Sequence, residues 1–112
     1  MRKMLVGVMV LICLGTLSLW AGPALAAEEL GKSVYMSKCA LCHGPQGDGK
    51  GPAAATLTTS PGDFTSPQFW QGDVEKKIAD SVANGKGVMP AQNLKPAEIK
   101  AVTEYISKTF KK

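Results

Sequence analysis

The sequence predicts an all-α domain with three main helices and one long loop between the first two. Apolar residues recur at helical spacing in three segments, 30–40, 73–84 and 96–110. Residues 44–72 separate the first two segments, are rich in glycine, proline, serine and threonine, and show no strand-like alternation. The length of 112 residues provides for a single domain.

The first 26 residues have the layout of a signal peptide. Two basic residues precede an apolar run of seventeen residues, 4–20, and Ala24 and Ala26 provide the small side chains that a signal peptidase accepts. We therefore expect cleavage after Ala26, which assigns 1–26 to a signal peptide and 27–112 to a mature domain exported to the periplasm. A run of this length is also just sufficient to cross a bilayer, so an uncleaved membrane anchor is the alternative.

The helical segments carry start and stop signals. Asp73 is expected to cap the second helix and Gly85 to end it in a left-handed conformation. Pro96 suits the first turn of the third helix. The apolar sides of the three helices are, in order, Leu30, Val34, Tyr35 and Met36; Val74, Ile78 and Val82; and Ile99, Val102, Tyr105, Ile106 and Phe110.

Residues 44–72 form a loop that is unusually long for a small domain. The loop contains Phe64, Phe69 and Trp70, and a disordered linker rarely contains aromatic residues so closely spaced. We therefore expect the loop to wrap around a bound group rather than to be disordered. Removal of 26 of the 112 residues leaves 86, a size at which an apolar core alone is barely sufficient, so a buried cofactor is expected.

The element that decides the chemistry is Cys39-Ala40-Leu41-Cys42-His43. Two thiols three positions apart can each add to a vinyl group of one haem, and the adjacent histidine then reaches the iron from the same side. The motif predicts one covalently attached haem c, with Cys39 and Cys42 as its thioethers and His43 as the proximal ligand of its iron.

Three other interpretations apply to the two cysteines. A structural zinc site needs four ligands, whereas the mature chain offers two cysteines and one histidine. A disulfide between Cys39 and Cys42 stays open for an exported protein, and so does a thioredoxin-like dithiol, although the latter normally belongs to a βαβ unit. The signal peptide, the helical pattern and the long loop together favour haem attachment.

The second axial position of the iron calls for a methionine. His43 is the only histidine, and two methionines remain after residue 26, Met36 and Met89. Met36 precedes the motif in the same helix, so we expect it to pack in the core. Met89 lies in a turn-forming stretch 46 residues after His43, from which a thioether can approach the opposite face of the haem; an ordinary loop methionine is the alternative. Two axial ligands leave no iron site for a substrate, so the pattern predicts electron transfer rather than bond chemistry.

The mature domain is close to neutral. Without Arg2 and Lys3, eleven of the thirteen basic residues remain against nine acidic ones, a net charge of about +2, and no arginine is left. Two haem propionates would cancel this charge. A nucleic-acid partner is therefore not expected.

These residues resemble the class I cytochrome c family, in its group of small monohaem bacterial cytochromes and cytochrome domains of larger oxidoreductases. The similarity extends from Leu30 to Phe110. In the first helix, Gly31 and Tyr35 resemble the Gly-x-x-x-aromatic surface that packs on the last helix of the family, where Tyr105 is the counterpart.

Two further stretches carry the resemblance, and one position departs from it. Gly51-Pro52 is similar to the Gly-Pro whose proline carbonyl accepts a hydrogen bond from the ligand imidazole, which implies that Pro52 orients His43. Residues 84–90, with Met89, resemble the stretch that carries the distal methionine. The family often has serine or threonine at the start of its last helix; here the residue is Lys95, so we expect a less well capped start.

The resemblance implies a cytochrome c-like fold, with three main helices and a long loop wrapped around one covalent haem. It also implies an exported electron carrier that is not itself an enzyme. Its partners would be redox proteins, a reductase or an oxidase, and the chain would be a monomer or a subunit of a complex. Two alternatives stay open: a cytochrome subunit of a larger periplasmic or membrane oxidoreductase complex, and a haem enzyme or sensor with an open distal site.

Overall fold

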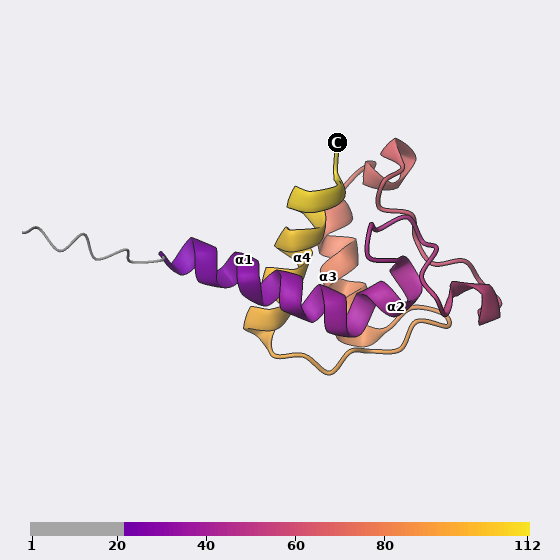
Figure 1. Cartoon of the computed structure of the whole chain (residues 1–112), viewed down its shortest axis with the longest axis horizontal. Coiled ribbons are helices and arrows are strands. Elements are labelled where there is room, and N and C mark those ends of the chain that lie inside the picture. The colour runs from indigo at the N-terminus through magenta and orange to yellow at the C-terminus, as the bar shows by residue number, and fades with distance from the viewer. Residues whose placement is uncertain (1–21) are drawn as a thin grey trace, which may run out of the picture.

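The first helical unit runs into the Cys39–His43 segment without a break. The computed structural model describes residues 22–112, so the apolar run 4–20 of the expected signal peptide lies outside the described residues. Helix α1 spans Pro23–Val34, a π-helical turn spans Tyr35–Cys39, and α2 spans Ala40–His43 (Figure 1). The helix therefore begins earlier than the predicted residue 30, because Pro23 suits a first turn and the alanines after it favour helix.

The other two helices have the predicted boundaries. Helix α3 spans Val74–Asn84; the Asp73 carboxylate accepts from the Lys76 N–H at 3.4 Å, and Gly85 ends the helix with φ at 78°. Helix α4 spans Pro96–Phe110. Residues 22–112 contain no β-strand, only an isolated bridge between Lys86 and Met89.

The start of α4 is better capped than expected. The Lys95 ammonium has no acceptor atom, but the Glu98 carboxylate accepts from the Lys95 backbone N–H at 2.7 Å. This contact is one half of a capping box, the half supplied by the third residue of the helix. An acidic residue in the first turn also interacts favourably with the helix dipole. The loss of serine or threonine at the cap is therefore partly compensated.

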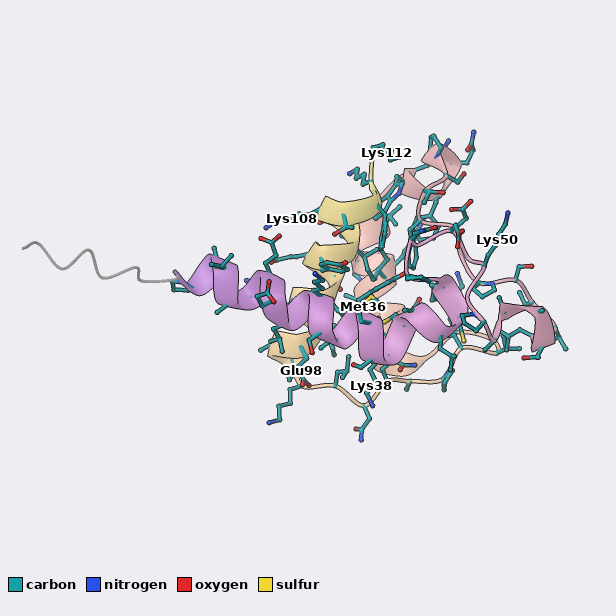
Figure 2. The ribbon with its side chains drawn as sticks, in the orientation of Figure 1. Met36, Lys38, Lys50, Glu98, Lys108 and Lys112 are labelled. Carbon is teal, nitrogen blue, oxygen red and sulfur yellow. The ribbon has the colours of Figure 1, made fainter. Side chains whose placement is uncertain are left out.

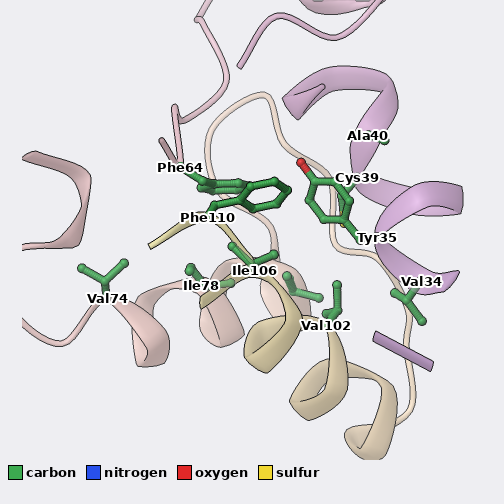
Figure 3. Packing of buried hydrophobic residues seen from close by; sticks show 11 residues of the cluster. Val34, Tyr35, Cys39, Ala40, Phe64, Val74, Ile78, Val102, Ile106 and Phe110 are labelled. Atoms are coloured by element: carbon green, nitrogen blue, oxygen red, sulfur yellow. The ribbon is translucent and has the colours of Figure 1, made fainter. Parts of the chain in front are cut away.

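The core lies where α1 and α3 pack on α4. Tyr35 and Val102 are fully buried and Ile106 is nearly so. Figure 3 shows the rings of Tyr35, Phe64 and Phe110 together above Val102 and Ile106. The Tyr35 and Tyr105 rings lie 5.5 Å apart, which confirms the predicted packing of the first helix on the last. The predicted core position of Met36, which Figure 2 labels, is wrong: the residue is 48% exposed, because the buried side of this helix carries Gly31, Val34 and Tyr35 instead.

Gly31 lets α1 approach α4 closely. A Cβ at this position would overlap the Ala101 carbonyl of α4 and lie 2.8 Å from the Tyr105 Cβ. Gly31→Val is therefore expected to lower the free energy of unfolding by about 3 kcal/mol, since the backbone must move to admit the side chain. Denaturant unfolding of the haem-bearing protein measures the effect. Lys32→Val, at the exposed neighbouring position, is the control; an equal loss in both variants would contradict the close-packing explanation.

The long loop is attached to the core through its aromatic residues. It contains two 3₁₀ turns, Ala54–Thr56 and Pro67–Trp70. Phe64 is buried, and the Trp70 indole N–H donates to the Phe64 carbonyl at 2.7 Å. The Lys111 ammonium lies 5.6 Å from the centre of the Trp70 ring, so the loop also meets the end of α4. The aromatic residues of the loop therefore belong to the packed domain.

Among residues 22–112, no helix is both long enough and apolar enough to span a membrane.

Candidate haem-binding site

The two cysteines of the motif lie one helical turn apart, where the π-helical turn meets α2. Cys39 is buried, Cys42 is half-buried, and both are free thiols. Burial, with the neighbouring Cys42 as a smaller cause, raises the pKa of Cys39 to about 11. Cys39 is therefore a protonated thiol near neutral pH.

His43 follows Cys42 and is held by the loop. Its Nδ1 lies 3.1 Å from the Gly62 carbonyl oxygen, and its ring stacks on Phe64 with centroids 4.6 Å apart and planes at 15°. A carbonyl only accepts, so Nδ1 carries the proton and Nε2 keeps its lone pair. Burial lowers the pKa of His43, more than the Gly62 hydrogen bond raises it. The imidazole is thus neutral and presents Nε2 as a metal ligand.

The hydrogen bond predicted from the His43 imidazole to the Pro52 carbonyl is replaced by another one in the structure. Pro52 is exposed, and the acceptor of the imidazole is Gly62 instead. The reason is the path of the chain after the motif: the Gly51 N–H donates to the Cys42 carbonyl at 3.0 Å, and the Ala53 N–H donates to the Leu41 carbonyl at 2.9 Å. These bonds hold the Gly51-Pro52 backbone against the outer carbonyls of α2.

Gly51 shows how close this approach is. A Cβ there would overlap the carbonyls of Ala40 and Leu41, so only glycine lets the loop lie against α2. The loop then continues for ten residues and returns over the imidazole at Gly62. Sequence reasoning missed both Gly62 and the stacking role of Phe64. Phe64 was noted as an aromatic loop residue, but a backbone carbonyl leaves no signal in the sequence.

Met89 lies on a tight turn beyond α3. The N–H groups of Lys86 and Met89 each donate to the other's carbonyl at 2.9 Å, and Gly87 takes a positive φ of 56°. The turn is joined to α3 by the Gln92 N–H, which donates to the Val82 carbonyl at 2.9 Å. Met89 itself is half-buried and packs against the core. The thioether is therefore carried by a well-defined turn, as the sequence predicted.

The residues present fit a covalently bound haem. Two free thiols on one helical turn, a neutral imidazole with a free Nε2 and a thioether on a fixed turn make up the donor set that a haem c requires. Cys39 and Cys42 would hold the porphyrin, while His43 and Met89 would hold its iron. Residues 22–112 contain no group of three or more histidine, cysteine, aspartate or glutamate side chains that could hold a metal ion together.

A helical domain with this donor set defines a c-type cytochrome. Comparison with known families makes the assignment specific: residues 26–106 match the family described as cytochrome C oxidase, cbb3-type, subunit III. The chain belongs to this family of c-type cytochromes and carries a covalently bound haem c with its iron.

Two curated relatives share the match. The chain is 36% identical over 84 residues to the cbb3-type cytochrome c oxidase subunit CcoP of Azospirillum brasilense. The aligned residues make up 72% of this chain and 28% of the relative. It is 31% identical over 83 residues to the cbb3-type cytochrome c oxidase subunit FixP of Azorhizobium caulinodans, and this alignment covers 71% of this chain and 26% of the relative. The chain thus corresponds to about a quarter of the length of these relatives.

A solved structure shares the fold. A chain of the reducing HAO-like protein complex of Kuenenia stuttgartiensis superposes with a TM-score of 0.64 at 22% identity. The superposition covers 72% of this chain and 41% of that chain. At this identity the similarity shows the fold alone.

Proposed function

We propose that this chain is a one-electron-transfer cytochrome that works as a subunit of a larger oxidoreductase complex, on the periplasmic side of a membrane. The observation that carries the proposal is the Cys39–His43 turn, where two free thiols adjoin an imidazole whose Nδ1 is engaged by Gly62 and whose Nε2 is free. When bound, haem c supplies a reversible one-electron couple at its iron.

The cysteines provide permanent attachment. Each S–H adds across one vinyl group, the sulfur bonding to one carbon and the hydrogen to the other, so no oxidant is needed. Cys39 and Cys42 are three residues apart on one helical turn, so their side chains lie on the same side of it. The attachment residues therefore also staple a small core to its cofactor.

The protein ligands favour electron transfer over catalysis. The Gly62 carbonyl, by accepting from Nδ1, orients the imidazole and raises its basicity, and Phe64 restricts its rotation. Met89 on its turn would be the second protein ligand of the iron, and a thioether ligand raises the reduction potential. With His43 and Met89 both holding the iron, a substrate would find no free ligand position there. The loop 44–72 would cover the haem, with Phe69 and Trp70 beside Phe64.

A subunit role is favoured over a free carrier by the relatives. Both CcoP and FixP are described as subunits of a cbb3-type cytochrome c oxidase, and this chain matches about a quarter of each. Its redox partners would then be other subunits of such a complex. The free exported carrier is the second candidate, and it rests on the expected cleavage site after Ala26, which would release residues 27–112 into the periplasm.

Native purification separates the two candidates. Membranes and the soluble periplasmic fraction of the same cells are resolved by size-exclusion, following haem absorbance, and the mature N-terminus is determined by mass spectrometry. The subunit proposal expects the chain in a detergent-solubilised particle much larger than the chain itself. A soluble monomer beginning at Ala27 would support the free carrier. A colourless protein with unmodified Cys39 and Cys42 would contradict both.

A further inference from the structure

Tyr35 contacts the chain near the start of the attachment segment Cys39–His43 and directly after its end. Its backbone carbonyl accepts from the Ala40 N–H, across the wide turn of the π-helical segment. Its hydroxyl donates to the Gly44 carbonyl at 2.6 Å, directly beyond His43. The two contacts of Tyr35 thus lie on either side of Cys42 and His43, and the first of them directly follows Cys39. π-helical turns of this kind are often found at functional sites.

The core fixes the position of the Tyr35 ring. The side chain is fully buried, and its ring lies 5.3 Å from Phe110, 5.5 Å from Tyr105 and 6.5 Å from Phe64. In Figure 3 the ring of Tyr35 lies beside Cys39, and its hydroxyl oxygen points away from Val102 and Ile106. Burial raises the pKa of Tyr35 far above its usual value, so the hydroxyl stays a donor at every working pH.

Gly44 is held on both sides of its backbone. Its N–H donates to the Ala40 carbonyl at 2.9 Å, and its carbonyl accepts from both the Tyr35 hydroxyl and the Gly47 N–H, the latter at 3.1 Å. Gly44 takes a φ of 84°, which allows the chain to leave α2 sharply after His43. The direction of the chain at His43 therefore depends on a contact made from the core.

We propose that Tyr35 is a positioning residue for haem attachment: its hydroxyl, bonded to Gly44, holds the Cys39–His43 turn in the orientation from which both thiols and the imidazole reach one haem. The inference rests on the proposed roles of Cys39, Cys42 and His43. It adds a residue that touches none of the reacting atoms and acts through Gly44.

Tyr35→Phe tests the proposal, because it keeps the ring and removes only the hydroxyl. Tyr105→Phe is the matched control: Tyr105 packs on the same ring, and its hydroxyl makes no hydrogen bond within the described chain. In the haem-bearing proteins, amide exchange of Gly44 and Gly47 is expected to be about tenfold faster in Tyr35→Phe, with α3 amides unchanged. The NMR shifts of the ferric haem methyls are expected to redistribute, since they report the orientation of the imidazole. Tyr105→Phe should change neither.

Several outcomes would overturn the proposal. Equal exchange at Gly44 and unchanged haem-methyl shifts in Tyr35→Phe would remove the positioning role, and a uniform increase across all helices would show a merely structural one. If Tyr35→Phe does not fold, 3-fluorotyrosine can be incorporated into the Tyr105→Phe variant, where Tyr35 is the only tyrosine left. Fluorination makes the Tyr35 hydroxyl a stronger donor, so amide exchange at Gly44 should become slower. Unchanged exchange would reject the positioning role of Tyr35. Mass spectrometry of the unaltered protein is done before these experiments. If the peptide that contains Cys39 and Cys42 carries no haem, the proposed function is wrong, whereas the Tyr35–Gly44 hydrogen bond is not contradicted.

Discussion

Replacing both Cys39 and Cys42 with alanine is expected to abolish covalent haem completely. Both thiols are free and lie on one helical turn next to a neutral imidazole, and the described chain has no other cysteine that could take their place. Acid-acetone extraction followed by a pyridine-haemochrome spectrum measures the haem that stays with the protein. The intact mass should correspond to the polypeptide alone, where the unaltered protein carries one haem more.

Leu41→Ala is the matched control for this prediction. Leu41 lies between the two cysteines and is 61% exposed, so its truncation removes side-chain volume from the same turn without removing a thiol. Full covalent haem is expected in this variant. Haem that resists extraction in the double cysteine variant would show that attachment occurs elsewhere. Loss of haem in Leu41→Ala as well would show that the turn, not the thiols, is the sensitive feature.

Replacing Met89 with alanine is expected to open the distal position of the iron. The turn that carries Met89 is held by two reciprocal backbone hydrogen bonds between Lys86 and Met89, which do not involve the side chain. The substitution should therefore leave the backbone in place and remove only the thioether. The expected results are a change from low-spin to high-spin ferric iron, ready binding of carbon monoxide to the ferrous form, and a lower reduction potential.

Met36→Ala is the matched control for Met89→Ala. Met36 is the other methionine of residues 27–112, and its side chain is 48% exposed near the start of the attachment segment. Its truncation should leave spin state, carbon monoxide binding and potential unchanged. An unaltered spectrum in Met89→Ala would assign the distal ligand elsewhere. Carbon monoxide binding by the unaltered protein would favour the haem enzyme or sensor with an open distal site.

The aromatic cluster connects stability to the site. The Phe64 ring contacts three other rings. It stacks on the His43 imidazole, and its centroid lies 5.0 Å from that of Phe69 and 6.1 Å from that of Phe110. The long loop therefore reaches the imidazole and the end of α4 through one ring. Packing that stabilises the domain also restricts the ligand, so core substitutions here are expected to alter redox properties as well as stability.

The boundaries of the last two helices could be predicted because their signals are local. Asp73, Gly85 and Pro96 act on the turns that contain them, and apolar residues at helical spacing define a buried side without reference to the rest of the chain. The first helix was placed less well. Its π-helical turn leaves no local signature. Met36 is next to Tyr35 in the sequence, but the buried side of the helix is the one that carries Gly31, Val34 and Tyr35, so Met36 is exposed.

The class of chemistry follows from the amino-acid sequence, since two cysteines and a histidine at this spacing, with one methionine far along the chain, restrict the cofactor and its expected ligands. Which backbone groups support those ligands depends on the fold. Gly62 accepts from His43 and Gly44 accepts from Tyr35, and both acceptors are carbonyls, which every residue possesses. A carbonyl acquires such a role only through the path of the chain, so folding had to bring Gly62 over the imidazole and exclude Pro52 from it.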